Sequence, residues 1–470
     1  MPQDLEPSSE EMRALVNAAM DRIVAYVESL PTQPAARKTR SAELARELTA
    51  PIPEDGVGFD DILSTIFDRA ITMGHNGASP GFMAYIPGGG VFAAAVADLV
   101  SRSINRFTGV WDASPGLIQL ESNVIRWFCD EVVGYPPTSG GILTSGGSLA
   151  HFSAVVAARR DRLPEDFLSG TLYGSDEAHH SVAKAAALAG FPADRVRHVA
   201  VDDRYRIRVD ALRAAVRADR ERGLRPFFLV GNAGSTNTGA VDDLEALADL
   251  AREEGLWFHV DGAYGGFFLL TERGRAALRG IERADSLILD PHKSLFLPYG
   301  VGSLLVRDAG ALRRAHSASA QYLPPMQEER GFADFSELSP ELSRDFRGLR
   351  VWLPLMLHGA GAFRRALDEK LDLAARACTA LQRVPGMEIV AEPQLSLVAF
   401  RVRRPGVEGR ALDALNEDVL RRVNEWGRVF LSGTTLPCGF VLRMCVLSFR
   451  THAAQIDQAV ADVAAALAEA

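Results

Sequence analysis

Helical spacing of apolar residues is evident at both ends of the chain. In residues 10–30 the apolar side chains fall on one face of a helix, at Met12, Leu15, Val16, Ala19, Ile23, Val24 and Val27. This spacing predicts an amphipathic helix, whose apolar face packs on its own domain or, as we favour, on a second subunit. The segment QIDQAVADVAAALAEA, residues 455–470, predicts a last helix in the same way.

Between about residues 140 and 310, short apolar runs alternate with longer amphipathic stretches. The short runs are TLYGS, RHVAV, FFLVG, LWFHVD and SLILD, and the stretches between them include VDALRAAVRADRERG and DDLEALADLAREEG. This alternation predicts an α/β fold with a mostly parallel central sheet and helices on its faces. Ligand sites in such sheets gather at the carboxyl ends of the strands.

The pattern changes again after about residue 357. A long helical stretch around SRDFRGLRVWLPLMLHGAGAFRRALDEKLDLAARAC is followed by MEIVAEPQLSLVAFRVRR, which predicts strands. We therefore expect an N-terminal helical segment over residues 1–85, a large α/β domain over 86–357 and a small α+β domain over 358–470.

Composition and charge are those of an ordinary globular protein. The 470 residues are 47% hydrophobic and 24% charged, and the formal net charge is −9. This sign argues against nucleic acid or an anionic membrane surface as a partner. The four cysteines form no CxxC pair, which argues against a zinc site and disulfides. The N-terminus lacks the features of a secretion signal and no run of ~20 apolar residues occurs, so we expect a cytoplasmic protein without a membrane span.

The stretch ADSLILDPHKSLFLPYG, residues 284–300, places polar residues inside an apolar run. Asp290, His292 and Lys293 follow directly on the predicted strand SLIL. A turn leaving a buried strand would account for them. However, Lys293 lies between apolar flanks, and burial of an ammonium ion without a partner is costly. Lys293 is therefore a candidate catalytic residue.

Three other strand ends carry candidate chemistry. TSGGSLA joins a glycine-rich turn to a helix start, which suits a phosphate; His179 follows TLYGS, and Asp261 ends LWFHVD. Singly, each has a structural explanation: a serine cap, a core histidine and a turn-capping carboxylate. Together with a lysine, they meet the needs of pyridoxal phosphate (PLP), namely a Schiff-base amine, a partner for the pyridine nitrogen, a stacking ring and a phosphate site.

The motifs TSGGSLA, SDEAHHSV, GSTNTGAVDD, HVDGAY and DPHKSLFLPYG occur in this order along the chain. In this order they resemble the group II PLP-dependent amino acid decarboxylases, most of all the aromatic-L-amino-acid decarboxylase branch. The resemblance runs from about Ser79 to Arg450. It implies PLP fold-type I, a homodimer, a small-molecule amino acid substrate and no metal.

The resemblance also implies roles for individual residues. Lys293 matches the Schiff-base lysine, Asp261 the partner of the pyridine nitrogen, His179 the ring-stacking histidine, and Tyr322 the tyrosine that protonates the substrate carbon. The remaining cofactor contacts would be His292, Ala263, Gly147, Ser148 and Thr236. The segment around Tyr322, QYLPPMQEERGFADFSELSP, has no helix or strand period, which predicts a loop that closes over the substrate.

Three positions depart from the family pattern. Ser294 stands where tryptophan usually follows the lysine, and His151 replaces an asparagine or threonine. Gly88 stands where the animal catechol-amino-acid enzyme has threonine, so recognition of a catechol by that route is not implied.

The substrate side chain would lie against Tyr85, Ile86, Pro87 and Phe107, an apolar lining that favours an aromatic or large apolar amino acid. These residues are equally compatible with ordinary core. Three alternatives stay open. Arg106 would suit an acidic amino acid, as in glutamate decarboxylases. A decarboxylating aldehyde synthase or aminotransferase of the same fold is a second, against which Tyr322 argues. The third is a cofactor-binding protein without catalytic activity.

Overall fold

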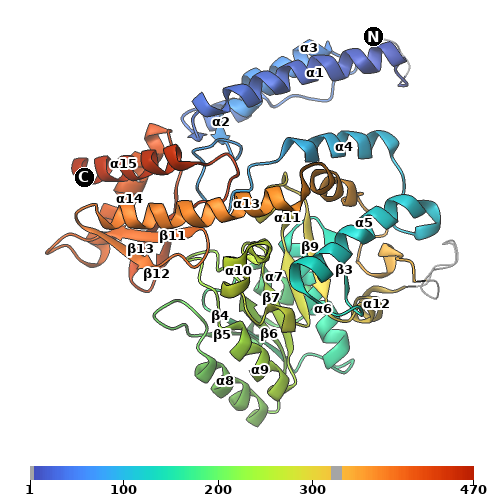
Figure 1. Ribbon diagram of the computed structural model, residues 1–470, viewed down its shortest axis with the longest axis vertical. Helices are drawn as coiled ribbons and strands as arrows, with labels where there is room; N and C mark the ends of the chain where they lie inside the picture. The colour runs from blue at the N-terminus through green and yellow to red at the C-terminus, as the bar shows by residue number, and fades with distance from the viewer. Residues whose placement is uncertain (1–4, 319–330) are drawn as a thin grey trace.

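A sheet of seven strands forms the centre of the structure, a computed structural model that describes residues 5–318 and 331–470 (Figure 1). Within it β9 runs antiparallel to both of its neighbours, and every other pair is parallel. In spatial order the strands are β3 (Gly140–Thr144), β9 (Gly302–Val306), β8 (Ser286–Leu289), β7 (Trp257–Asp261), β6 (Arg225–Asn232), β4 (Gly170–Ser175) and β5 (Val196–Val199).

The five apolar runs of the sequence form β4, β5, β6, β7 and β8, so the predicted α/β class with a mostly parallel sheet is confirmed. All residues of β4 and β8 are buried. Burial of successive side chains, which point to opposite faces, requires cover on both sides of the sheet. The loops at the strand ends are therefore the accessible part of this layer.

Helices connect the strands of the seven-stranded sheet and make up most of the rest of this part of the chain. The predicted amphipathic stretches become α8 (Val209–Glu221) and α9 (Leu244–Glu254). Asp243 caps α9 by accepting the N–H of Ala246, and Gly255 ends it with φ of 66°. The other helices of this part are α4 (Phe92–Ile104), α5 (Pro115–Trp127), α6 (Gly147–Arg162), α7 (Ser181–Leu188), α10 (Glu272–Ala277), α11 (Pro291–Ser294) and α12 (Gly310–His316).

A second, antiparallel sheet lies toward the C-terminus, in the order β10 (Met387–Ala391), β11 (Leu397–Val402), β13 (Gly439–Cys445) and β12 (Ser432–Leu436). The small α+β unit expected here is thus present, with α14 (Gly409–Trp426) and α15 (Ala453–Glu469). The long helix α13 (Gly348–Gln382) runs through the expected boundary at 357/358 and has a kink at Gly359, where φ is 70°. The three domain boundaries stay a prediction.

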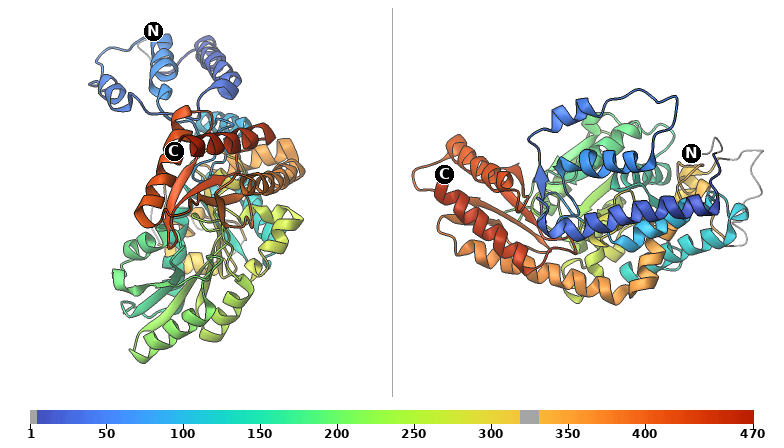
Figure 2. Two further views of the ribbon diagram at one scale, coloured as in Figure 1. Left: turned by 90° about the vertical axis from the view of Figure 1, so that its left-hand side faces the viewer. Right: turned by 90° about the horizontal axis from the view of Figure 1, so that it is seen from above.

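The predicted N-terminal helix is α1 (Ser9–Ser29), which begins with a capping box between Ser8 and Glu11. It lies beside α3 (Phe59–Ser64) at one end of the molecule, with α2 (Ser41–Glu47) nearby (Figures 1 and 2). A two-stranded ladder of β1 (Ala36–Arg37) and β2 (Gly74–His75) joins this segment to the body. None of the residues of α1 is buried in this chain. None of the helices over 5–318 and 331–470 has the length and apolar character needed to cross a membrane.

Candidate active site

Five loops meet at one edge of the large sheet, because β3, β4, β6, β7 and β8 all run in the same direction. They enclose a cavity of about 290 Å³. All eight residues that the sequence predicted to contact the cofactor line it: Lys293, His292, Asp261, Ala263, His179, Thr236, Gly147 and Ser148.

Lys293 lies on α11, the single helical turn that follows β8. Its Nζ is 3.0 Å from Oδ2 of Asp290, which is almost completely buried at the end of the strand. Burial alone would lower the pKa of Lys293, but the carboxylates of Asp290 and Asp261 outweigh it and raise the pKa. The half-buried ammonium thus has an ion-pair partner. This role of Asp290 was not predicted, although its position three residues before the lysine on a helical turn was a signal.

Asp261 ends β7 and forms the anionic side of the cavity. Its Oδ1 accepts the N–H of Ala263 at 3.1 Å, and its Oδ2 lies 3.6 Å from Nε2 of His151. Burial by itself raises the pKa of Asp261, whereas the charges of His151, Lys293 and His179 lower it, and the net pKa lies below its usual value. The site therefore favours the ionised carboxylate, which is the form that can hold a protonated ring nitrogen.

His179 follows β4, four residues beyond the end of the strand. Its Nδ1 accepts the backbone N–H of Ser181 at 3.3 Å and lies 2.6 Å from the Oγ of the same serine. Burial lowers the pKa of His179 to about 4. At neutral pH the ring is uncharged, which suits packing against a flat aromatic ligand.

The glycine-rich turn after β3 leads directly into α6. The first N–H groups of a helix have no acceptor within the helix, so Gly147 and Ser148 present amide hydrogens and a hydroxyl at its positive end. A Cβ added at Gly147 would lie 3.2 Å from Oδ2 of Asp290, so the turn is tight against the lysine segment. This corner of the cavity suits an anion such as phosphate.

The donor set fits PLP, which needs an amine, an ionised carboxylate, a neutral ring and a phosphate site in one cavity. Oδ1 of Asp290 and Nε2 of His151 are buried and have no hydrogen-bond partner among the described residues. Buried polar atoms of this kind usually have a partner, so their lack of one next to the cavity is consistent with a polar ligand there.

A family model described as the pyridoxal-dependent decarboxylase conserved domain matches residues 42–403 of the chain. The chain belongs to this family. An aromatic-L-amino-acid decarboxylase of Bacillus atrophaeus is 35% identical over 464 residues, which cover 97% of this chain and 96% of that protein. This protein is thus a PLP-dependent amino acid decarboxylase, as the motifs predicted.

Solved structures agree with this assignment over the whole chain. Oryza sativa TDC, crystallised with PLP and tryptamine, has a TM-score of 0.94 at 26% identity and matches over 100% of this chain and 99% of its own. Rhodiola rosea 4-hydroxyphenylacetaldehyde synthase has a TM-score of 0.91 at 25% identity, with the same coverage. The fold of the decarboxylase is that of these relatives, and the family and the PLP-bound Oryza sativa structure give its cofactor as PLP.

The four residues predicted to line the substrate side chain do not line the Lys293 cavity within one chain. Ile86 and Pro87 are buried, whereas Tyr85 is 54% exposed and Phe107 is 39% exposed. Their role in substrate binding stays a prediction. Tyr322, the predicted proton donor, lies outside the described residues.

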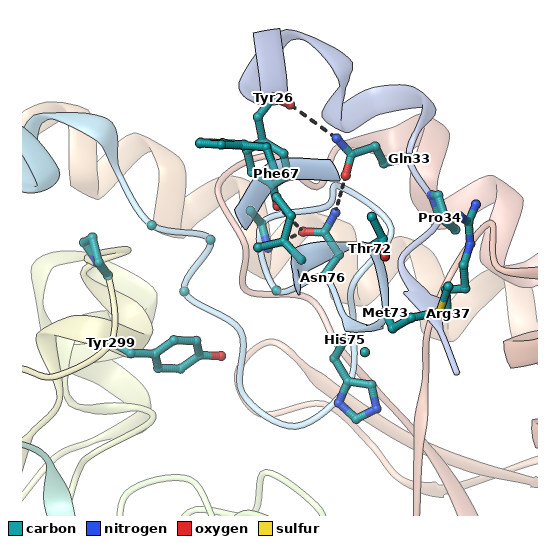
Figure 3. Close-up of a pocket in the computed structure, with 18 of the residues that line it drawn as sticks. Tyr26, Gln33, Pro34, Arg37, Phe67, Thr72, Met73, His75, Asn76 and Tyr299 are labelled. Carbon is teal, nitrogen blue, oxygen red and sulfur yellow. Dashed lines mark hydrogen bonds between the residues drawn. The ribbon is translucent and has the colours of Figure 1, made fainter. Parts of the chain in front are cut away.

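A second, larger cavity of about 660 Å³ adjoins the first, and His292 lines both (Figure 3). The N-terminal segment forms one wall, where Tyr26 donates to Asn76 and Asn76 donates to Gln33 (3.1 and 3.0 Å). Tyr299 points into it from the opposite side. The approach to the cofactor cavity of the decarboxylase is thus built by segments that are far apart in the sequence.

Gly88, one of the departures from the family pattern, lies where the chain passes the lysine segment. A Cβ at this position would lie 2.3 Å from the carbonyl oxygen of His292 and 3.0 Å from that of Lys293. The close approach of two backbones leaves no room for a side chain here. Glycine at position 88 is therefore explained by packing, whichever substrate the enzyme uses.

We predict that Gly88→Ala displaces the backbone around Lys293 and lowers cofactor occupancy, at a cost in stability of about 1–3 kcal/mol. The thermal midpoint and the PLP content of purified protein, measured by absorbance, report both effects. Gly116→Ala on α5 is the matched control, because a Cβ there meets nothing within 4 Å. A variant at Gly88 with full PLP content and the parental midpoint would contradict the close approach.

Proposed function

We propose that this decarboxylase converts an aromatic L-amino acid to the corresponding amine and carbon dioxide. The observation that carries the proposal is the cavity around Lys293, with its amine, carboxylate, neutral imidazole and helix start, in a chain whose nearly full-length relative is named for aromatic amino acids. Neither Arg106, the residue that would favour an acidic substrate, nor the four residues predicted to line an aromatic side chain borders either cavity. The support for an aromatic substrate therefore comes from the relative.

Bound PLP supplies an acceptor for the electron pair that the departing carbon dioxide leaves behind. Lys293 would hold the cofactor through its Nζ. Asp261 would keep a proton on the ring nitrogen, because its own carboxylate stays ionised in the site. His179 would pack on the ring, and the start of α6 would hold the phosphate.

The remaining step is delivery of a proton to the substrate carbon. We assign it to Tyr322, following the family resemblance. A phenol brought to the carbon with water excluded can act as a general acid. This assignment separates simple decarboxylation from aldehyde formation, because an enzyme without the proton donor would leave the substrate carbon open to oxygen.

The test of the substrate class is carbon dioxide release across the twenty amino acids and hydroxylated aromatic amino acids. We expect the highest kcat/KM for an aromatic substrate, and glutamate or aspartate as the best substrate would contradict the proposal.

Lys293→Ala should lose activity by several orders of magnitude. Borohydride reduction and peptide mapping should label Lys293, and the exposed Lys184 should stay unlabelled, with Lys184→Ala as the active control.

For Tyr322→Phe we expect continued release of carbon dioxide, with the product shifted from amine toward aldehyde, ammonia and peroxide. The reason is that the variant lacks the hydroxyl that protonates the carbon. All four products should be quantified with oxygen present and absent. An unchanged amine yield at an unchanged rate would remove Tyr322 from the mechanism.

We infer that the protein works as a homodimer. Among the large apolar side chains that are more than one-third exposed, three helices carry two or more each. They are Met12, Val16 and Val24 on α1, Phe92, Leu99, Val100 and Ile104 on α4, and Met356 and Leu357 on α13. Apolar surface on this scale is typical of a subunit interface. A second copy of the chain would cover it and would also reach Phe107, which follows α4.

We predict that Leu357→Asp weakens dimerisation at least about tenfold, because a buried leucine contributes roughly 1.5–3 kcal/mol. Sedimentation velocity over a range of concentrations measures the effect. Leu168→Asp is the control, since Leu168 is 51% exposed and lies outside these helices. A fully active monomer, or equal behaviour of the two variants, would overturn the inferred interface.

A further inference from the structure

His151 is the departure from the family pattern that the sequence left without an explanation. It lies one helical turn after the phosphate-binding corner, on α6, and is only 1% exposed. Its side chain points into the cofactor cavity, where its Nε2 is 3.6 Å from Oδ2 of Asp261. This nitrogen is buried and has no hydrogen-bond partner among the described residues.

The opposite side of the His151 ring is held by Ser181. The Nδ1 of His151 lies 3.0 Å from the Oγ of Ser181, and the same oxygen lies 2.6 Å from the Nδ1 of His179. A chain of side chains therefore connects Asp261 to His179 through His151 and Ser181. Its two ends are the groups proposed to contact the cofactor, one at the ring nitrogen and the other at the ring face.

We propose that His151 is a positioning residue for Asp261: it holds a proton on Nε2 toward Oδ2 of Asp261, while Ser181 fixes the ring at Nδ1. This inference rests on the proposed function, in which Asp261 holds the proton on the ring nitrogen of PLP. It concerns a residue of this chain that the family pattern does not assign.

The positions of the protons support this arrangement. The backbone N–H of Ser181 donates to Nδ1 of His179, so that nitrogen already has a donor. The hydroxyl of Ser181 can then donate to Nδ1 of His151, which lies 3.0 Å away. The pKa of His151 lies below its usual value, so the neutral ring carries one proton, and on Nε2 this proton faces Oδ2 of Asp261.

The electrostatic balance makes Asp261 and His151 depend on each other. Burial outweighs the carboxylates of Asp261 and Asp290 at His151, so the pKa of His151 lies below its usual value. Interaction with His151 is the largest of the influences that lower the pKa of Asp261. A neutral His151 that donates from Nε2 thus favours the ionised form of Asp261.

The neighbouring His259 does not compete for this role. Its Nδ1 lies 2.7 Å from the Oγ of Ser286, which also accepts the indole N–H of Trp257. Burial and the proximity of His151 hold its pKa well below the usual value, so the ring is neutral. It packs edge-to-face against His151 at 5.2 Å between centroids and restricts the orientation of that ring.

Two substitutions at His151 test its contact with Asp261 and its contact with Ser181 separately. The amide nitrogen of glutamine can take the place of Nε2 and donate to Asp261, whereas the shorter asparagine can take only the place of Nδ1 and reach Ser181. We expect His151→Gln to bind PLP nearly as the parent does. His151→Asn and His151→Phe should bind it about tenfold more weakly, the loss expected for a hydrogen bond to a charged group.

The primary measurement is the dissociation constant of PLP for the cofactor-free protein, from fluorescence titration. The visible absorption band of the holoenzyme and the thermal midpoint of the cofactor-free protein are recorded for each variant. In the holoenzyme, His151→Asn and His151→Phe should lower kcat and alter the absorption band, with KM little changed. Ser153→Ala is the control on the same helix, because Ser153 is buried and its hydroxyl has no partner among the described residues.

Parental PLP binding in all three variants of His151 would overturn the inference, as would weak binding by His151→Gln together with parental binding by His151→Asn. Equal losses of thermal stability with an unchanged absorption band would show a packing role only, and would also overturn it. Asp261→Asn tests the underlying function separately. If Asp261→Asn behaves as the parent, the role of Asp261 is wrong; if it loses activity while the His151 variants do not, only the present inference fails.

Discussion

Six strands of the large sheet run in one direction, and the active site depends on this shared direction of five of them. Because the carboxyl ends of parallel strands meet at the same edge, β3, β4, β6, β7 and β8 bring five separate segments to one cavity. The strands themselves are buried on both faces, so the loops are where polar chemistry can be placed. A rigid apolar layer thus positions a cluster of charged and hydrogen-bonding groups.

Charge compensation within that cluster decides which groups can remain ionised. Asp290 and Asp261 together keep the buried Lys293 protonated in the absence of a ligand, although burial opposes this. His179 and His259 are neutral for the opposite reason, since burial outweighs the nearby carboxylates. The cavity therefore holds a cationic lysine, ionised carboxylates and neutral imidazole rings, which are the groups that PLP needs.

The approach to this cavity is built in a different way. Backbone packing between Gly88 and the lysine segment, and the wall formed by the N-terminal segment, shape the larger cavity around His292. The exposed apolar side chains of α1, α4 and α13 line neither of the two cavities. The eight residues predicted to contact the cofactor thus lie together in one chain, whereas the four predicted to contact the substrate side chain do not line this cavity.

Sequence by itself determined the class of fold. The apolar runs between residues 140 and 310 specified the strands, and the residue types at their ends singled out Lys293, Asp261, His179 and the glycine-rich turn, because strand ends follow from local pattern. The family resemblance supplied the remaining residues predicted to contact the cofactor, and all eight line one cavity. The partners of those residues depended on tertiary structure. Asp290 as the counter-ion of Lys293, and His151 and Ser181 between Asp261 and His179, are contacts across different strands and helices, whose distances no local pattern contains. The same holds for Gly88, where only the approach of a second backbone explains the lack of a side chain.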